Sequence, residues 1–550
     1  MQKLPQMKLL KAKQKNRLVL FKFLLLSIFA CTLLVVGCQP KPASQTPQTA
    51  TKQRLSIGTT LKLRTIDPAD SYEQASATWI NNIGERLYTY QVGTTKIIPQ
   101  LATALPKISK DGLTYIIPLR NNVLFHDGTE FNAKAMEFSL RRFMENQGNP
   151  AVLLTDIVAS LKASGPYELT IKLKKPFSAF TALLTFNGMC AVSPKAYEIG
   201  AGKFKPTTFV GTGPYKLTKY APDSLKLDIF EKYWGEKPKN QGVDVQFYNS
   251  AGNLYNAFST GGVDIAYQEL DSQQILTLEQ QAKTKNWQVV SASGNYITNW
   301  TLNINKAPLN NPEIRKALAL IVDRELLAQR VRFAQSEALY SMIPSKFEAS
   351  KPIFKEQYSQ NAAKAKQILA KAGYTPQNPL KIEVWYPSPS PNRELLGNAL
   401  KAIAQEKLEG VLQIEINTVE RPVAFANLRK GIYQTFLQDW YADFFDADNF
   451  VQPFLDCRQA VGNICKNGAS QNLGSFYYSQ RINSLIDQQR KELNPEKRNK
   501  ILRQIDEIVA EEVPYIPLLQ NKDYAFAQEN IQGVVLDPTQ QLPLWGIQKK

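Results

Sequence analysis

A chain of 550 residues is too long for one hydrophobic core, and its 43% of hydrophobic residues is ordinary for a globular protein. With 66 Lys and Arg against 48 Asp and Glu, its formal charge is +18, which would suit a nucleic-acid-binding protein. Seven of these basic residues, however, lie in residues 1–37, which hold no acid, and the others are scattered. We therefore expect no nucleic-acid partner.

The first 37 residues have the pattern of an export signal. Basic residues precede the apolar run LVLFKFLLLSIFACTLLVV, which leads into VVGC. A basic segment followed by an apolar one is typical of a secretory signal, which is removed during export. Gly37 directly before Cys38 resembles a bacterial lipobox, in which the Cys is lipidated and becomes the mature N-terminus; an uncleaved anchor is the alternative. Residues 38–52 are rich in Pro, Gln, Ser and Thr, so we expect a tether there.

The composition gives no support to common catalytic or metal chemistry. The single histidine, His126, lies in a turn-like HDG without a serine elbow nearby, so we expect a structural role for it. The sequence has no CxxC pair or second His for a zinc site, and no GxGxxG or GxxxxGK[ST] motif for a nucleotide. We expect no catalytic residue, no metal and no cofactor. A hydrolytic, glycosidase-like surface lipoprotein with a distant carboxylate pair is a remote alternative.

From residue 54 the pattern mixes strands with helices. The elements expected in the first half are strands at 54–60, 111–120 and 166–176 and an amphipathic helix at 131–144. Later, a helix at 361–374 is expected to end at Gly373. Near the C-terminus, Asn494 followed by Pro495 predicts the start of a helix that stops before Pro514.

Strands and helices alternate between residues 381 and 440. Strands are expected at 381–386, 412–419 and 432–440, with helices at 392–408 and 421–431 between them. This alternation predicts a largely parallel sheet. Asp443 then follows the carboxyl end of the third strand, which is the edge where open α/β sheets bind ligands. A polar loop that caps the strand is the alternative.

The segment QDWYADFFDADNF, residues 438–450, places four Asp residues among five aromatic residues. A carboxylate beside aromatic rings is costly unless a positive group meets it. That group belongs either to another part of the chain or to a ligand.

The cysteines after the signal have two expected states. Cys190 follows an apolar run and is expected to be a buried free thiol. Cys457 and Cys465 flank a short loop in a chain that we expect to be exported, so an oxidising compartment favours a disulfide between them. Spacing alone does not place their Cβ atoms within bonding range.

Motifs along nearly the whole mature chain resemble those of one family. In order, they are RTIDPAD (64–70), ERLYTY (85–90), the long segment 101–142, VGTGPYKLTKY (210–220), EKYWG (231–235), 303–325, AKQILAKAGY (365–374) and 498–518. Each motif is weak alone, but their shared order resembles the peptide/nickel class of extracytoplasmic solute-binding proteins. These proteins are the oligopeptide- and dipeptide-binding components of ABC importers.

The resemblance implies an α/β, two-lobed, periplasmic-binding-protein-like fold (type II, cluster C) with an extra subdomain in the first lobe. By analogy, the parts are lobe I at 53–95, 208–295 and 520–550, its extra subdomain at 96–207, and lobe II at 296–519. The ligand would lie between the lobes and be buried by hinge closure. Family peptides bind in an extended form, with their backbone paired to the protein.

The family's aspartate that binds the α-ammonium of a peptide is matched here by Asp443. The resemblance therefore implies that Asp443 binds the ligand amine, with Trp440, Tyr441 and Phe444 around it. The neighbours Asp446 and Asp448 are expected to be loop and helix-cap groups.

Arg393 lies in about the region where dipeptide binders of the family place a carboxylate clamp. The alternative is a solvated arginine at a helix start, and without a clamp longer peptides would be accepted. The implied protein binds short peptides and delivers them to the transmembrane subunits of an ABC permease. It would act as a monomer in the periplasm or at the cell-envelope surface, lipid-anchored to the membrane. The same fold could instead bind a metal chelate, haem, glutathione, an oligosaccharide or a muropeptide.

Overall fold

The computed structural model describes residues 53–268, 270–536, 538–539 and 541–550. The predicted signal segment, the tether and the lipidation site Cys38 lie outside these residues. None of the helices in the described part of the chain has both the length and the apolar character that crossing a bilayer requires.

One large mixed sheet runs through the described residues. Its strands lie in the order β15-β14-β16-β12-β19-β11-β1-β10-β9-β8, and β13 (Ser336–Ala338) pairs with β19 as an additional strand. Two long antiparallel strands, β12 (Gln288–Leu302) and β19 (Tyr515–Ala527), form its centre, and their register shifts between Ser293 and Ile297. The predicted lobe boundaries at 295/296 and 519/520 fall inside these two strands. The division into these residue ranges stays a prediction.

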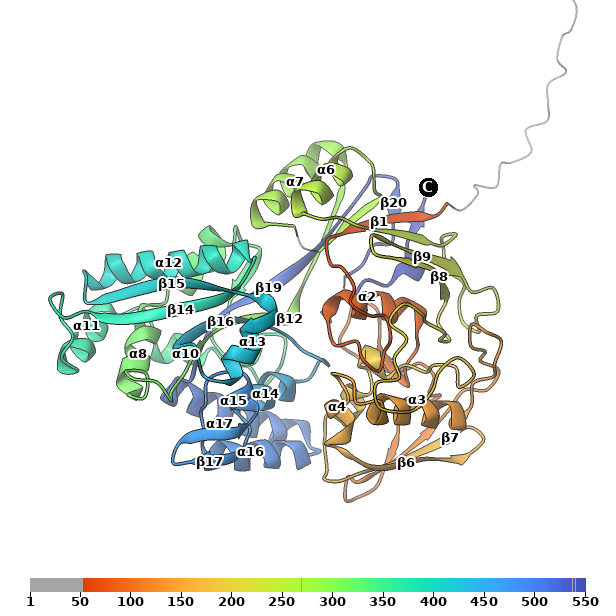
Figure 1. The fold of residues 1–550 in the computed structure, drawn as a ribbon, viewed down its shortest axis with the longest axis horizontal. Helices are drawn as coiled ribbons and strands as arrows, with labels where there is room; N and C mark the ends of the chain where they lie inside the picture. The colour runs from red at the N-terminus through yellow and green to blue at the C-terminus, as the bar shows by residue number, and fades with distance from the viewer. Residues whose placement is uncertain (1–52, 269, 537, 540) are drawn as a thin grey trace, which may run out of the picture. The chain divides into compact units, whose positions relative to one another are not determined.

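The predicted alternation of strands and helices between residues 381 and 440 is confirmed. The elements, in order, are β14 (Leu380–Ser388), α12 (Pro391–Leu408), β15 (Leu412–Glu420), α13 (Arg421–Arg429) and β16 (Thr435–Tyr441). Strand β14 pairs in parallel with both β15 and β16. Helix α12 lies along β15 and β14 (Figure 1), because its apolar side, with Leu400 and Ile403, is buried in the core that the helix shares with these strands.

Other helices of the second half share this core. They are α8 (Pro312–Ile321), α9 (Arg324–Leu326), α10 (Ile353–Gln357), α11 (Ala362–Lys371), α14 (Gln452–Leu455), α16 (Gln480–Lys491) and α17 (Pro495–Glu512), and α15 (Ala469–Asn472) packs on α14. The predicted start of α17 is confirmed, because the Asn494 side chain accepts a hydrogen bond from the backbone N–H of Lys497 at 3.0 Å. Gly373, just after α11, has a φ of +88°, which suits the predicted helix end.

The other end of the large sheet is built from the first half of the chain. Strand β1 (Leu55–Thr59) lies in parallel between β10 (Val243–Phe247) and β11 (Ile265–Tyr267), so the predicted strand at 54–60 is confirmed. Strands β9 (Ser224–Ile229) and β8 (Tyr215–Ala221) extend the sheet in antiparallel fashion. Helix α6 (Ala251–Ser259) packs on β1 and β11, and α7 (Ser272–Lys285) contacts β12 (Figure 1).

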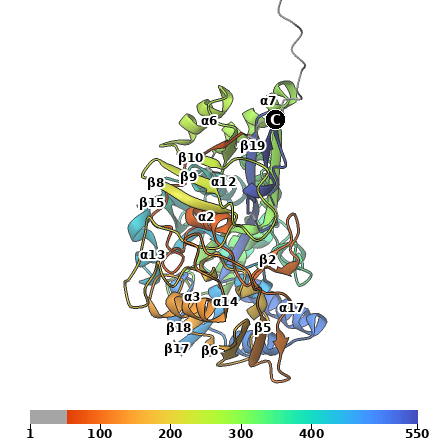
Figure 2. The same ribbon diagram turned by 90° about the vertical axis from the view of Figure 1, so that its right-hand side faces the viewer.

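A separate antiparallel sheet has its own core. Its strands, in the order β4-β5-β7-β6, are Lys107–Ile108, Thr114–Pro118, Glu168–Leu173 and Val158–Gly165. Helix α3 (Ala133–Glu145) packs on β6 and β7, and Asn132 caps its start. Figure 2 shows α3 beside β6. The predicted strands at 111–120 and 166–176 and the predicted helix at 131–144 are therefore confirmed. This sheet lies within the predicted subdomain, 96–207.

Shorter elements complete the chain. They are α2 (Gln74–Ile83), β2 (Tyr88–Tyr90), β3 (Ile97–Pro99), α4 (Val152–Thr155), α5 (Phe180–Leu183), β20 (Ile531–Gln532) and β21 (Gln548–Lys549). Helix α2 is the one that matters for the site, because the residues just before it reach the end of β16.

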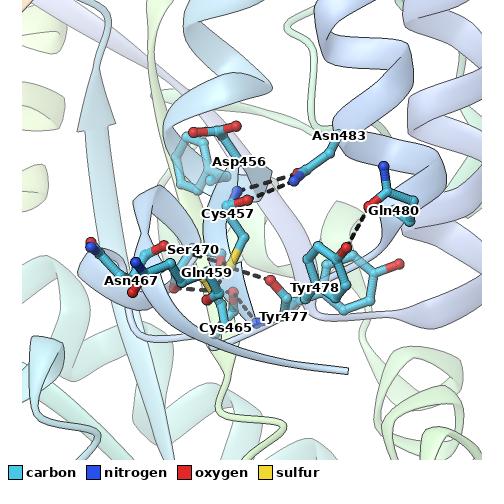
Figure 3. The surroundings of a disulfide bond; sticks show 12 residues. Asp456, Cys457, Gln459, Cys465, Asn467, Ser470, Tyr477, Tyr478, Gln480 and Asn483 are labelled. Atoms are coloured by element: carbon cyan, nitrogen blue, oxygen red, sulfur yellow. Dashed lines mark hydrogen bonds between the residues drawn. A yellow bond between two sulfur atoms is a disulfide. The ribbon is translucent and has the colours of Figure 1, made fainter. Parts of the chain in front are cut away.

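Cys457 and Cys465 are joined by a disulfide with an S–S distance of 2.02 Å. They lie on a hairpin formed by β17 (Cys457–Val461) and β18 (Ile464–Gly468), shown in Figure 3. Asn483 of α16 holds the start of this hairpin, because its side chain accepts from the N–H of Cys457 at 3.2 Å and donates to the Cys457 carbonyl at 2.6 Å. Cys190 is a buried free thiol as predicted, and burial raises its pKa to about 12.

Candidate ligand-binding site

Asp443 lies two residues beyond the end of β16, at the sheet edge where the strand pattern predicted it. It is half-buried and lines a cavity of about 130 Å³. The other lining residues are Ser71, Tyr72, Glu73, Gln74, Ala77, Thr78, Phe186, Asn187, Gly188, Tyr441, Ala442, Thr539 and Gln541. They come from both the first and the second half of the chain, so the cavity lies between parts assigned to the two predicted lobes.

The carboxylate of Asp443 meets neutral groups. The Tyr72 hydroxyl donates to its Oδ2 at 3.0 Å, and the Asn449 side-chain amide donates to the same oxygen at 3.5 Å. Within the described part of the chain, no Lys, Arg or His pairs with it. Burial raises the pKa of Asp443 to about 6, although the hydrogen bonds from Tyr72 and Asn449 oppose this rise. Asp443 is therefore mostly ionised at neutral pH while lacking a cationic partner in the described chain.

Tyr441 forms one wall of the cavity. Its ring stacks on Tyr296 of β12, with centroids 4.0 Å apart and planes at 14°. Its hydroxyl donates to Oδ1 of Asp523 at 3.2 Å, and the amide of Gln268 donates to the other oxygen at 3.2 Å. The predicted position of Tyr441 at the site is consistent with this wall, and the hydrogen bonds fix the ring in place.

Trp440 and Phe444, two other residues predicted to contact the ligand, pack elsewhere. Trp440 points to the opposite face of β16 from Tyr441, where its indole N–H donates to the Asn449 carbonyl at 3.0 Å and its ring packs on Phe454. Phe444 is 6% exposed and belongs to the core of the separate antiparallel sheet, beside Phe177. Both serve as packing groups in this structure, and their contact with a ligand stays a prediction.

Asp446 and Asp448 have the structural roles that were predicted for them. Asp446 pairs with Arg498 at 2.5 Å, and its side chain accepts from the backbone N–H of Asp448 at 2.8 Å. Asp448 is 1% exposed and pairs with Arg490 at 2.7 Å. With Asp439, which pairs with Arg393, three of the four acids in the aromatic segment are thus neutralised by cations of the chain itself.

Arg393 does not reach Asp443 and pairs with a different acid. It lies in the first turn of α12, and its Nη2 is 2.5 Å from Oδ2 of Asp439. The hydroxyls of Tyr296 and Thr298 also donate to Asp439, at 2.8 and 2.6 Å. Three donors therefore satisfy Asp439, and the predicted contact of Arg393 with a ligand carboxylate stays untested.

Arg332, which the sequence patterns did not single out, does not line the cavity but lies near Tyr296 and Tyr441. It is 6% exposed, its Nη1 donates to Ser272 at 2.9 Å, and it forms no ion pair within the described residues. Burial lowers its pKa, while the negative charges of nearby groups, including Asp439, oppose the change. The only local signal was an arginine within the short stretch VRFA, residues 331–334, and nothing in that stretch tells which elements surround it.

His126 has the structural role that was expected. Its Nδ1 accepts from the backbone N–H of Gly211 at 3.3 Å, so Nε2 carries the proton and donates to the Gly213 carbonyl at 3.0 Å. Burial lowers its pKa to about 4, which keeps the ring neutral. No cluster of three His, Cys, Asp or Glu side chains suited to a metal occurs among the residues that the structure describes.

Comparison with known proteins assigns the chain to a family. The model of the family described as "Bacterial extracellular solute-binding proteins, family 5 Middle" matches residues 96–462, more than half of the chain. The glutathione-binding protein GsiB of Escherichia coli O6:K15:H31 is 25% identical over 491 residues, which are 86% of this chain and 90% of that protein.

Solved structures show the same fold. The ABC transporter-associated periplasmic binding protein DppA from Helicobacter pylori, in complex with peptide STSA, has a TM-score of 0.73 and 23% identity, over 90% of this chain and 98% of that one. NikA from Brucella suis, in complex with Fe(III)-EDTA, has a TM-score of 0.77 and 19% identity, over 90% and 100%. The fold is therefore the two-lobed α/β fold of periplasmic binding proteins, and the chain belongs to the family 5 bacterial extracellular solute-binding proteins.

Proposed function

We propose that the protein is the extracytoplasmic substrate-binding component of an ABC importer and that it binds short peptides through their free α-amino group at Asp443. The observation that carries this proposal is a half-buried carboxylate on a cavity with no cationic partner in the described chain. A ligand ammonium would form a charge-assisted hydrogen bond with it. The cost of placing Asp443 among aromatic rings is then offset when the ligand binds.

The surroundings of Asp443 suit an amine better than other cationic groups. Tyr72 and Asn449 each donate to Oδ2, which leaves Oδ1 to accept from the ligand. A metal ion would need several ligands, and His126 is engaged with the backbone around Gly211. These features favour a primary amine over direct metal ligation.

Arg332 is our candidate for the carboxylate end of the peptide. It is buried and lacks an ion pair among the described residues, and a buried unpaired guanidinium is costly. It lies near Tyr296 and Tyr441, which stack on each other, and Tyr441 lines the cavity. A ligand with an ammonium at one end and a carboxylate at the other would pair with both Asp443 and Arg332.

Delivery to a membrane permease requires movement and anchoring. The cavity is lined by residues of both predicted lobes, so uptake and release would require the lobes to move apart. The predicted lipid on Cys38 would hold the protein at the membrane, next to the transmembrane subunits of the permease. We propose that it works there as a monomer, in the periplasm or at the cell-envelope surface.

A different solute is the second candidate, because relatives are named for glutathione and one solved relative holds Fe(III)-EDTA. Native mass spectrometry of gently purified protein, followed by sequencing of whatever is released, separates these possibilities. We expect a ladder of peptides two to five residues long. A single species such as a chelate or a sugar would overturn the peptide assignment, and a ligand returned chemically changed would indicate a hydrolase.

A further inference from the structure

The two arginines near the aromatic wall differ in their partners. Arg393 is 2.5 Å from Asp439, whereas Arg332 has no carboxylate partner in the part of the chain that the structure describes. Both arginines are largely buried: Arg332 is 6% exposed, and the Arg393 side chain is 12% exposed. Among the described residues, Asp439 forms its ion pair with Arg393, while Arg332 is near Asp439 without pairing with it.

Asp439 is held rigidly where it meets Arg393. It lies directly opposite Thr298 in the antiparallel pairing of β16 with β12, and the Thr298 hydroxyl donates to its Oδ1 at 2.6 Å. The Tyr296 hydroxyl donates to Oδ2 at 2.8 Å. Two hydroxyls on the central strand β12 therefore fix the position of the Asp439 carboxylate, and Arg393 pairs with it there.

The pair is connected to the cavity through a single ring. Tyr296 donates its hydroxyl to Asp439 and stacks its ring on Tyr441, which lines the cavity. Asp439 and Tyr441 are two positions apart on β16, so they face the same side of the sheet. Asp439 therefore lies on the same face of β16 as Tyr441, which lines the cavity.

Resting on the proposed function, we infer that Asp439 is a specificity-determining residue that limits the site to peptides with a single carboxylate. By neutralising Arg393 it leaves Arg332 as the cation for the ligand's C-terminal carboxylate. A second carboxylate, on an acidic side chain or on the γ-linked glutamate of glutathione, would meet no free cation there. The favoured substrates are then neutral and basic peptides, rather than acidic peptides or glutathione.

The test compares calorimetric affinities of the native chain for Ala-Ala-Ala, Ala-Asp-Ala and reduced glutathione. We expect the native chain to favour Ala-Ala-Ala over Ala-Asp-Ala by about tenfold, since a second negative charge would lie near Asp439 without compensation. Asp439→Asn should move this ratio toward Ala-Asp-Ala by about tenfold, because it releases Arg393. Equal affinities in the native chain, or no change of ratio in Asp439→Asn, would overturn the inference.

Two matched variants separate charge from a general disturbance. Adding Arg393→Gln to Asp439→Asn removes both charges and should restore the native ratio. Arg393→Gln alone leaves Asp439 uncompensated and should disfavour Ala-Asp-Ala further, which is the opposite sign to Asp439→Asn. If the affinity ratio shifted equally and in the same direction in both single variants, the cause would be a general disturbance of the site. That result would contradict the role assigned to Asp439.

A ligand-free measurement keeps the inference apart from the proposed function. Phenylglyoxal modifies free guanidinium groups, and peptide mapping reports its rate at Arg393. We expect slow modification in the native chain and a rate at least several-fold higher in Asp439→Asn. If none of the three peptide probes binds, the proposed function is contradicted for these peptides. The modification rate of Arg393 still tells whether Asp439 holds that side chain. Equal rates in the two proteins would overturn the inference.

Discussion

The hydroxyl of Tyr72 donates to the carboxylate of Asp443 at 3.0 Å, which joins residues 371 positions apart in the sequence. This contact links the segment before α2 to the loop after β16. A second contact of the same kind is made by the backbone N–H of Phe445, which donates to the hydroxyl of Tyr90 at 3.0 Å. The loop that carries Asp443 is thus held by tyrosines from the first half of the chain, and neither supplies the positive charge that the carboxylate lacks.

Replacing Asp443 by Ala should weaken peptide binding by about 3 kcal/mol, or ~100-fold, because the ligand ammonium would be left buried without its counter-ion. Isothermal titration with a free-amine peptide and its N-acetyl form measures this loss. Acetylation should cost the native protein a similar factor and the variant almost nothing.

The matched control for Asp443 is Glu73→Gln. Glu73 lines the same cavity, but it already faces Arg64 at 3.3 Å. We expect this variant to change affinity by less than Asp443→Ala does. Native binding that is indifferent to acetylation would contradict the role of Asp443 as the amine anchor.

Peptide affinity should depend on pH through Asp443. In the ligand-free protein burial raises the pKa of Asp443 to about 6, and a bound ammonium lowers it again because it favours the ionised form. The association constant should therefore be constant above pH ~7 and fall as the pH drops below 6, approaching tenfold per pH unit.

Asp443→Asn is the control for this pH dependence, because it should remove the fall below pH 6. Glu85 and Asp506 are buried carboxyls whose pKa values burial raises to about 7, but both titrate away from the cavity. They should affect stability in both proteins alike. A pH profile that is the same in native and variant protein would assign the dependence to such groups instead of Asp443.

Arg332→Gln should selectively weaken peptides with a free C-terminal carboxylate. A peptide and its C-terminal amide should differ in affinity about tenfold or more in the native protein and hardly at all in the variant. Arg324→Gln is the matched control, since Arg324 is also a buried arginine without an ion pair among the described residues, but it packs on Tyr340 and Phe354. Loss of the amide discrimination in both variants would point to a general loss of structure.

The alternation of strands and helices was enough to predict the parallel block and the place of Asp443 at its edge. Period-two patterning within β16 also decides between neighbouring aromatic residues, since Trp440 faces the core and Tyr441 faces the cavity. The prediction that both contact a ligand treated them only as aromatic residues near Asp443. Counting along the strand would have separated them.

The pairing partners of the charged groups could not be predicted in the same way. Asp439 meets Arg393 only because β16 and α12 are brought together by β14, and it meets Thr298 only through the register of β12. Arg332 lies among residues of other elements for the same reason. Local patterns carry no information about such contacts, which depend on the order of strands in the sheet.

Cys38→Ser should release the protein from the membrane fraction. If Cys38 is lipidated, replacing its thiol removes the attachment point for the lipid, and cleavage of the apolar signal then leaves no membrane anchor. Fractionation of cells followed by immunoblotting measures the distribution. Cys31→Ser is the control, because Cys31 lies within the apolar run and should leave the protein membrane-bound. Protein that still sediments with membranes after Cys38→Ser would point to an uncleaved anchor.

Removing the disulfide should destabilise the second half of the chain without abolishing ligand binding. Cys457 and Cys465 close a loop with a sequence separation of 8, for which the loop-entropy estimate is about 2–3 kcal/mol of unfolding free energy. Denaturant unfolding of the Cys457→Ser, Cys465→Ser double variant measures the loss, and reductant should destabilise the native protein but not the variant.

The hairpin that carries the disulfide lies away from the cavity. It contacts Asn483, and its Arg458 pairs with Asp156, but none of these residues lines the cavity. Peptide affinity at low denaturant should therefore stay within a few-fold of native, and a larger loss would mean that the hairpin helps to hold the lobes closed around the ligand.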